Sequence, residues 1–134
     1  MQNNEEMQQK IMNKLSSYEQ QLNQLRQQFR AVDEGMVELS SLDHGLDEVE
    51  DSEGKDILAP VGRGIFVNAK FTSKDLIVDV GDKILVRKSI PETKEIIKNQ
   101  LERLGDLKKE LEEKMDEVQE EASLFLEEVQ SDSE

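Results

Sequence analysis

Residues 55–88 read KDILAPVGRGIFVNAKFTSKDLIVDVGDKILVRK and are rich in Val, Ile, Leu and Phe. Apolar residues alternate with other residues along this stretch, and a period of two is typical of β-strands. The alternation is interrupted at residues 62–64 (Gly-Arg-Gly) and 81–82 (Gly-Asp). A two-residue Gly-Asp loop suits a primed hairpin turn, because glycine accepts the positive φ that such a turn requires. The stretch therefore predicts four short strands arranged as two β-hairpins.

Two hairpins of this size are not expected to be stable alone. An isolated hairpin is at best marginally stable in water, and more strands or a covering layer are needed. We therefore expect another chain to complete these strands. The residues expected to carry this association are Ile65, Val67, Ala69, Phe71, Leu76, Val78, Val80, Ile84 and Val86.

The composition excludes several classes of function. The chain has 134 residues, no Cys and one His, so a disulfide framework, thiolate chemistry and a Cys/His zinc site are not expected. No apolar run approaches the roughly 20 residues that span a bilayer. The N-terminal residues lack the basic start and apolar middle of a secretion signal. We expect a cytoplasmic protein.

The net charge of −14 is unevenly distributed. Residues 1–53 hold 12 acidic and 4 basic side chains, residues 54–91 hold 4 and 7, and residues 92–134 hold 15 and 6. Acidic flanks repel phosphates and anionic lipids, so neither a nucleic acid nor a membrane surface is an expected partner.

The segment before the strands is predicted to be a long helix. Its apolar residues recur in alternating steps of four and three, which is typical of a coiled-coil seam. They are Ile11, Leu15, Tyr18, Leu22, Leu25, Phe29, Val32, Met36 and Leu39. The next apolar residues, Leu42, Leu46 and Val49, imply a three-residue slip of the seam. Gly45 and the acidic residues 47–54 indicate that the helix frays and ends there.

A second helix is predicted after the strands. Residues 89–92 (Ser-Ile-Pro-Glu) are a helix-start signal, because Pro is tolerated in the first turn and Glu complements the helix dipole. Lys94 and Lys108 are polar members of its seam. The apolar members are Ile97, Leu101, Leu104, Leu111, Met115, Val118, Ala122, Phe125 and Val129.

The two helices have matched lengths of about 40 residues, or about 60 Å each. We therefore expect an α+β fold, in which a long antiparallel two-helix coiled coil carries the two hairpins at one end. Its parts are a helix with an acidic linker (1–53), the hairpins (54–89), and a helix with an acidic tail (90–134). The alternative is that each helix pairs in parallel with another chain, but the strand insert would then have to splay between the helices.

No catalytic constellation is visible, so we expect neither an enzyme nor a bound cofactor or metal. Acidic side chains are abundant, but on helix faces they interact with solvent. His44 has no companion ligand or nucleophile near it in the sequence. The Gly-Arg-Gly at residues 62–64 lacks the Lys-Ser/Thr of a P-loop, and no helix follows it.

The chain ends carry more apolar side chains than one seam can bury. Leu124 and Leu126 flank Phe125, and Met7 lies beside the first seam near Ile11. Excess apolar surface on an acidic protein tends to mark a contact site. The alternative is that these residues broaden the seam or lie free in solvent. The candidate contact residues are Met7, Ile11, Leu124, Phe125, Leu126 and Val129.

The order of long helix, two hairpins and long helix resembles the α-type subunits of prefoldin, most closely the archaeal form. Residues 59–69 (APVGRGIFVNA) and 78–81 (VDVG) carry the resemblance, which extends over essentially the whole chain. The chain departs from the family at Asp82 and Lys83, where many relatives keep a small residue and a second Gly. Because of this departure, the resemblance does not determine the conformation of the second turn.

The resemblance implies a heterohexamer of two α-type and four β-type subunits, in which strands from all chains form an intersubunit β-barrel. It implies an ATP-independent chaperone that captures unfolded client proteins at its coiled-coil tips and delivers them to a group II chaperonin. The candidate contact residues would then be this chain's share of the client surface. The alternative is a structural scaffold or tether of a prefoldin-like complex, with one defined folded partner.

Overall fold

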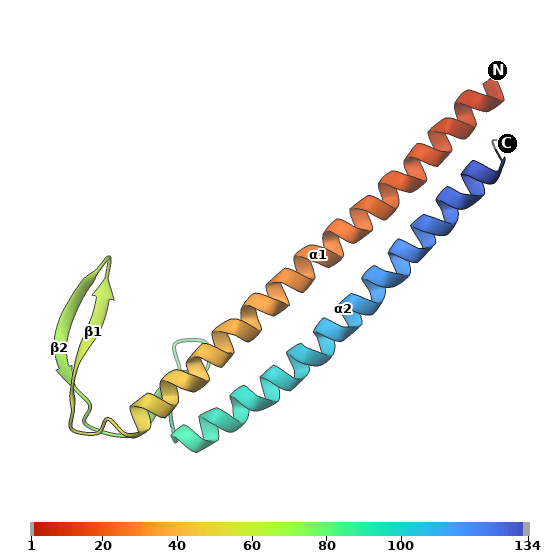
Figure 1. Cartoon of the computed structure of the whole chain (residues 1–134). Helices are drawn as coiled ribbons and strands as arrows, with labels where there is room; N and C mark the ends of the chain where they lie inside the picture. The colour runs from red at the N-terminus through yellow and green to blue at the C-terminus, as the bar shows by residue number, and fades with distance from the viewer. Residues whose placement is uncertain (1, 133–134) are drawn as a thin grey trace. The chain divides into compact units, whose positions relative to one another are not determined.

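The computed structural model describes residues 2–132 and contains two long helices and two β-hairpins (Figure 1). In chain order the elements are α1 (Gln2–Glu50), β1 (Asp56–Gly62), β2 (Ile65–Lys70), β3 (Leu76–Asp79), β4 (Leu85–Lys88) and α2 (Ile90–Asp132). The strands form two separate antiparallel sheets, β1-β2 and β3-β4. The predicted combination of two long helices and two hairpins is confirmed. The last two residues of the predicted acidic tail lie outside the described residues.

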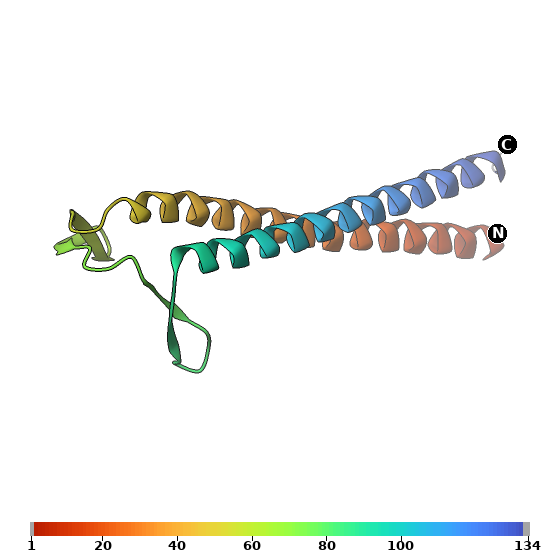
Figure 2. The ribbon, with the colours of Figure 1, turned by 90° about the horizontal axis from the view of Figure 1, so that it is seen from below.

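The described chain divides into two units, of which one is Val37–Glu102 and the other comprises the helix segments on either side of it. In the latter unit α1 and α2 run side by side and antiparallel, as both views show (Figures 1 and 2). Tyr18 contacts Phe125, and further along α1 Asp33 contacts Lys108. The residue number on α1 rises from 18 to 33 while the residue number of its contact on α2 falls from 125 to 108. The two helices are therefore antiparallel, as predicted.

The seam of this helix pair contains the residues that the heptad pattern predicted. The apolar members on α1 from Ile11 to Met36 are all half-buried. On α2, Leu111 is buried, and its seam neighbours are half-buried. A single narrow apolar stripe on each helix is thus covered by the other helix.

The unit Val37–Glu102 has its own small core. Leu46 from α1 and Ile90 and Ile97 from α2 are buried together. The partly buried side chains that pack against this core are Leu39, Val49, Leu76 and Leu101. Leu76 belongs to β3, so the second hairpin contributes a side chain to the contact between the helices.

The predicted slip of the seam after Leu39 is wrong. The structure continues in regular steps from Leu39 to Asp43 and Leu46, whereas Leu42 is 49% exposed. Asp43 was overlooked because it is polar, and Lys94 of α2 lies 3.7 Å from its carboxylate. The helix also continues without a break past Gly45 to Glu50, since burial of Leu46 outweighs the low helix propensity of glycine.

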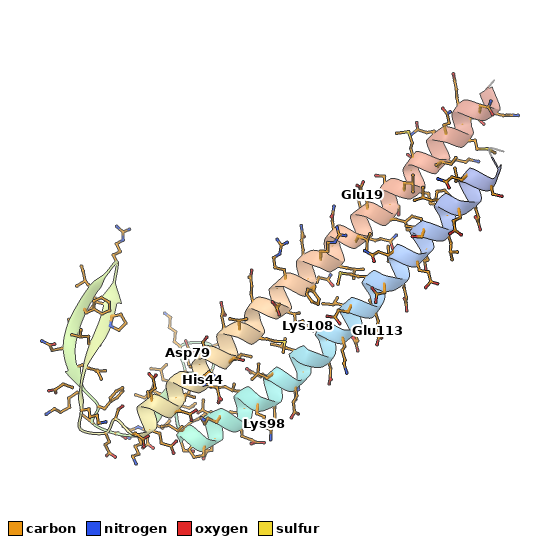
Figure 3. The ribbon with its side chains drawn as sticks, viewed as in Figure 1. Glu19, His44, Asp79, Lys98, Lys108 and Glu113 are labelled. Atoms are coloured by element: carbon orange, nitrogen blue, oxygen red, sulfur yellow. The ribbon has the colours of Figure 1, made fainter. Side chains whose placement is uncertain are left out.

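Two lysines of α2 occupy the seam and pair with aspartates of α1. Lys94 donates a hydrogen bond to Asp47, and this hydrogen bond raises the pKa of Lys94 above its usual value. Lys108, which is labelled in Figure 3, donates a hydrogen bond to Asp33 over 2.9 Å, and this hydrogen bond raises the pKa of Lys108. The Lys108 ammonium also lies 5.3 Å from the centroid of the Phe29 ring. A polar residue in a coiled-coil seam favours one register, because another register would leave it unpaired.

The start of α2 follows the predicted signal. The Ser89 hydroxyl accepts a hydrogen bond from the Glu92 backbone N–H at 3.2 Å, which is the arrangement of an N-cap. The Thr93 hydroxyl donates to the Ser89 carbonyl at 2.9 Å. Only Ser89 lies between the end of β4 at Lys88 and the start of α2 at Ile90, so the cap marks the boundary between strand and helix.

The second hairpin turn lies one residue beyond its predicted position. Asp82 and Lys83, with φ of 52° and 63°, are the loop residues, and the Ile84 N–H donates to the Gly81 carbonyl at 2.9 Å. Gly81, with φ of 106°, precedes the loop as a bulge residue. Gly81 therefore occupies the bulge and not the loop. Aspartate tolerates the left-handed region, so Asp82 can take a loop position without a glycine.

The two hairpins are copies of one sequence pattern, which the sequence analysis missed. Residues 55–69 (KDILAPVGRGIFVNA) and 74–88 (KDLIVDVGDKILVRK) align without gaps at an offset of 19, with six of 15 positions identical. In each copy three successive residues have a positive φ. They are Gly62 (144°), Arg63 (49°) and Gly64 (78°), then Gly81 (106°), Asp82 (52°) and Lys83 (63°). The repeated sequence thus encodes a repeated backbone.

We predict that Gly105→Ala stabilises the protein. A Cβ on Gly105 would lie 3.9 Å from the Met36 Cε, an ordinary van der Waals contact. The free energy of unfolding in urea should therefore rise by about 1 kcal/mol, the difference in helix propensity. Gly64→Ala is the control, since φ of 78° disfavours a side chain, and it should lower stability. A loss of stability in Gly105→Ala would contradict the helix spacing described here.

We also predict that the Lys108–Asp33 pair is lost at alkaline pH. Because the folded pKa of Lys108 is raised above 10.5, the pair stabilises the fold below that pH and ceases to do so as the pH rises through the folded value. In urea denaturation at pH values rising above 10.5, Lys108→Arg should lose less stability than the parent protein, since arginine stays protonated. Lys109→Arg, at an exposed neighbouring position, is the matched control and should behave as the parent does.

Candidate functional site

Exposed apolar side chains gather near the chain ends, in the paired-helix unit. We call Met7, Met12, Leu124 and Leu126 the helix-end surface, and their exposed fractions run from 43% to 66%. Met7 and Met12 come from α1, and the two leucines come from α2. Methionine adapts its shape to varied partners, and leucine adds apolar area. The surface is suited to apolar contacts without a fixed geometry.

Local helix geometry explains why the two leucines remain exposed. Successive residues of an α-helix are about 100° apart. With Phe125 in the seam, Leu124 and Leu126 therefore lie on opposite flanks of α2, where one partner helix cannot cover both. An open depression beside the first of these leucines is lined by Leu124, Glu127, Glu128 and Ser131.

The predicted contact residues divide into two groups. Met7, Leu124 and Leu126 are exposed, whereas Ile11, Phe125 and Val129 are half-buried in the seam. The first group belongs to the helix-end surface. The sequence analysis missed Met12, which is 66% exposed. Its position next to the seam residue Ile11 is the signal that could have identified it.

Phe125 is held in the seam by two contacts. Its ring meets Tyr18 edge-on, with ring centroids 6.1 Å apart and an interplanar angle of 60°. The Lys14 ammonium lies 5.0 Å from the same ring, within reach of a cation–π interaction. Both partners come from α1, so Phe125 is a structural link between the helices.

The hairpins form a second exposed apolar surface, which we call the hairpin surface. Its members are all at least 48% exposed, and they are Leu58, Val61, Ile65, Phe66, Val67, Ile77, Val80, Ile84 and Leu85. Four of the predicted association residues belong to it, namely Ile65, Val67, Val80 and Ile84. The other five predicted residues are half-buried, namely Ala69, Phe71, Leu76, Val78 and Val86.

The apolar residues missed by the sequence analysis share a location. Leu58 and Phe66 lie on the face of the first hairpin opposite to Ala59 and Val67, as the strand register shows. The alternating pattern directed attention to one face of each strand only. Apolar residues on both faces, with both sheet edges free, are typical of strands that another chain covers.

Among residues 2–132, no three or more His, Cys, Asp or Glu side chains are grouped so that they could hold a metal ion. No helix within the same range is long and apolar enough to cross a membrane.

Comparison with known proteins gives a consistent family. The family model described as "Prefoldin: Prefoldin subunit" matches residues 18–134. A "Prefoldin subunit alpha" of Methanobrevibacter smithii is 29% identical over 109 residues, which cover 81% of this chain and 70% of that protein. A "Prefoldin subunit alpha" of Methanococcus maripaludis is 36% identical over 94 residues, covering 66% of this chain and 60% of that protein.

A solved structure shares the fold. It is the cryo-EM structure of "filamentous PFD" from Methanocaldococcus jannaschii, with a TM-score of 0.74 and 24% sequence identity. The match covers 87% of this chain and 98% of that chain. Two long helices with two small hairpins between them are therefore an arrangement already seen in a solved protein.

We predict that Leu124 and Leu126 contribute little to stability, whereas Phe125 contributes substantially. In urea denaturation, Leu124→Gln and Leu126→Gln should each change the free energy of unfolding by less than about 0.5 kcal/mol, because both side chains are exposed. Phe125→Gln should cost about 2 kcal/mol, because the ring loses its contacts with Tyr18 and Lys14. Equal effects of all three substitutions would contradict this division.

Proposed function

Because this chain belongs to the prefoldin subunit family, we propose that it is the α-type subunit of an ATP-independent chaperone that holds unfolded polypeptides. The observation that carries the proposal is the exposure of Leu124 and Leu126 on either side of a seam residue. These leucines are not needed to pair the helices. Their exposure would cost solubility unless they contacted something else.

The chemistry of the helix-end surface suits an unfolded client. Its methionines and leucines offer apolar contacts without a shaped pocket, so many apolar segments can bind. The surrounding charge limits this binding to the surface itself. Residues 103–132 of α2 hold 11 acidic and 4 basic side chains. Such a helix repels acidic segments and stays hydrated, so apolar and basic client segments are favoured.

The hairpin surface supports assembly with other subunits. Residues 54–89 would be the association platform, and strands of neighbouring subunits would cover the hairpin surface and complete a β-barrel. We propose two α-type and four β-type subunits per complex. Several helix pairs in one complex would let weak individual contacts act together on one client, since linking sites raises their effective concentration.

Family membership supports the remaining parts of the proposal, which concern the receiving chaperonin, the location and the absence of a cofactor. The complex would pass its client to a group II chaperonin in the cytoplasm. No cofactor or enzymatic step is involved in this scheme, because the holding function depends on apolar contacts alone. The energy for release would come from the chaperonin's competing affinity for the client.

We predict that the double substitution Leu124→Gln, Leu126→Gln weakens client protection by about tenfold or more, since burying one leucine contributes roughly 1.5 kcal/mol or more. The measurement is light scattering of an aggregating client against the concentration of the complex assembled with its β-type partner. Val37→Gln, at a somewhat more exposed position outside the helix-end surface, is the control and should protect fully.

Unchanged protection by the double variant would remove the helix-end surface from the proposal. If the parent complex instead contained one defined folded protein and protected no unrelated client, the chain would be a structural tether. Native mass spectrometry of the complex, together with the light-scattering assay on unrelated clients, distinguishes these two cases.

A further inference from the structure

We propose that Met7 and Met12 are sites of reversible oxidation, and that their conversion to methionine sulfoxide weakens the binding of clients to the helix-end surface. The oxidant would be hydrogen peroxide or an organic peroxide. The proposal rests on the proposed function, because it assigns a means of control to the same surface. The choice of these two methionines rests on their exposure and on the packing of the other methionines.

Methionine is the only sulfur-containing residue of this chain. The 134 residues include five methionines and no cysteine, so no thiolate within the chain competes for the oxidant. A thioether is oxidised at its sulfur, and access of the oxidant to that atom then decides which methionine reacts. Met1 lies outside the described residues, so exposure can be compared for the other four.

Exposure divides these four methionines into two pairs. Met7 and Met12 of α1 are 61% and 66% exposed. Met36 of α1 and Met115 of α2 are half-buried in the seam. The methyl carbon of Met36 lies 3.9 Å from the place of a Cβ on Gly105, so this side chain packs against α2. A peroxide molecule therefore reaches the sulfur atoms of Met7 and Met12 more readily.

The chemical step consumes one peroxide molecule for each sulfur. A lone pair of the thioether sulfur attacks one peroxide oxygen, so that the O–O bond breaks as an S–O bond forms. The proton of the transferred oxygen passes to the departing hydroxide, which leaves as water when the oxidant is hydrogen peroxide. The sulfur loses two electrons and the peroxide gains them. Methionine sulfoxide reductases reverse the step with two electrons from a dithiol and release the oxygen as water.

Oxidation of these residues would alter the helix-end surface and spare the pairing of the helices. A sulfoxide is polar and hydrogen-bonded to water, so its burial against an apolar client segment costs free energy that burial of a thioether does not. Because Met7 and Met12 are exposed, the change removes little packing between α1 and α2. Leu124 and Leu126 are not oxidised, so client binding would be weakened and not abolished.

Peroxide treatment of the full-length chain tests the choice of sites. The treated chain is freed of peroxide, assembled with untreated β-type partner and mixed with an untreated client, so that only this chain is oxidised. Peptide mass spectrometry should show Met7 and Met12 oxidised several times faster than the two seam methionines. Equal rates of oxidation at the four described methionines would overturn the proposal.

The same treated complex gives the functional readout. Half-maximal protection in light scattering should require about threefold or more of the oxidised complex, since two apolar contacts with the client become polar. Incubation with methionine sulfoxide reductases should restore the parent value. Full protection after Met7 and Met12 are oxidised, or a loss that the reductases do not reverse, would overturn the proposal.

Leucine substitutions separate this control from general oxidative damage. Met7→Leu, Met12→Leu keeps the apolar area and the helix propensity, so this variant should protect clients before and after peroxide treatment. Met36→Leu, Met115→Leu is the matched control, which keeps the exposed methionines and should lose protection as the parent does. A Met7→Leu, Met12→Leu complex as sensitive to peroxide as the parent would overturn the proposal.

A polar substitution tests the same sites without an oxidant. Met7→Gln, Met12→Gln imitates the polarity of the oxidised side chains, so it should weaken protection by about threefold or more and leave the midpoint of urea denaturation unchanged. Unchanged protection would refute this inference and leave the proposed function intact, because the parent complex would still protect clients. A parent complex that protects no client before any treatment would contradict the proposed function, and this inference with it.

Discussion

A two-stranded sheet leaves a row of backbone hydrogen-bonding groups free on each of its edges, and this chain contains two such sheets. These sheets also expose apolar side chains to water, and in the first hairpin such side chains occupy both faces. Water can hydrogen-bond the free edge groups, but it does not cover the exposed apolar side chains of the strands. The long helices, by contrast, have narrow apolar stripes that one partner helix covers. The apolar stripes of the helices are thus covered within the chain, whereas the strands keep free edges and exposed apolar side chains.

The helix pair achieves its register with charge as well as with apolar contacts. Each seam lysine finds an aspartate on the facing helix, and Lys108 in addition lies over the ring of Phe29. A parallel arrangement or a shifted register would leave these ammonium groups without their partners, which is costly at a half-buried position. The acidic surface of α2 does not hold the helices together. It keeps the outer faces of the pair hydrated.

Much of this fold could be predicted from the sequence, because helix and strand differ in period. The seam residues of both helices followed from steps of three and four, and the start of the second helix followed from residues 89–92. The errors occurred where a polar or small residue has a structural role. Asp43 continues the seam without being apolar, and Gly81 forms a bulge instead of a loop.

Prediction of the candidate surfaces was less complete for a physical reason. Sequence periodicity shows which residues share a face, but exposure depends on which face another element covers. Phe125 and Leu126 are neighbours of similar polarity, and the contacts of Phe125 with Tyr18 and Lys14 separate their roles.

The repeated hairpin sequence indicates a route by which such a chain could arise. One repeat of 19 residues includes the strands, the bulge, the turn and the short connection to the next copy. Tandem copying of this segment within a gene would therefore add a whole hairpin, with its own open edge, in a single event. The number of exposed strand edges would then change by whole hairpins, without any redesign of the helices.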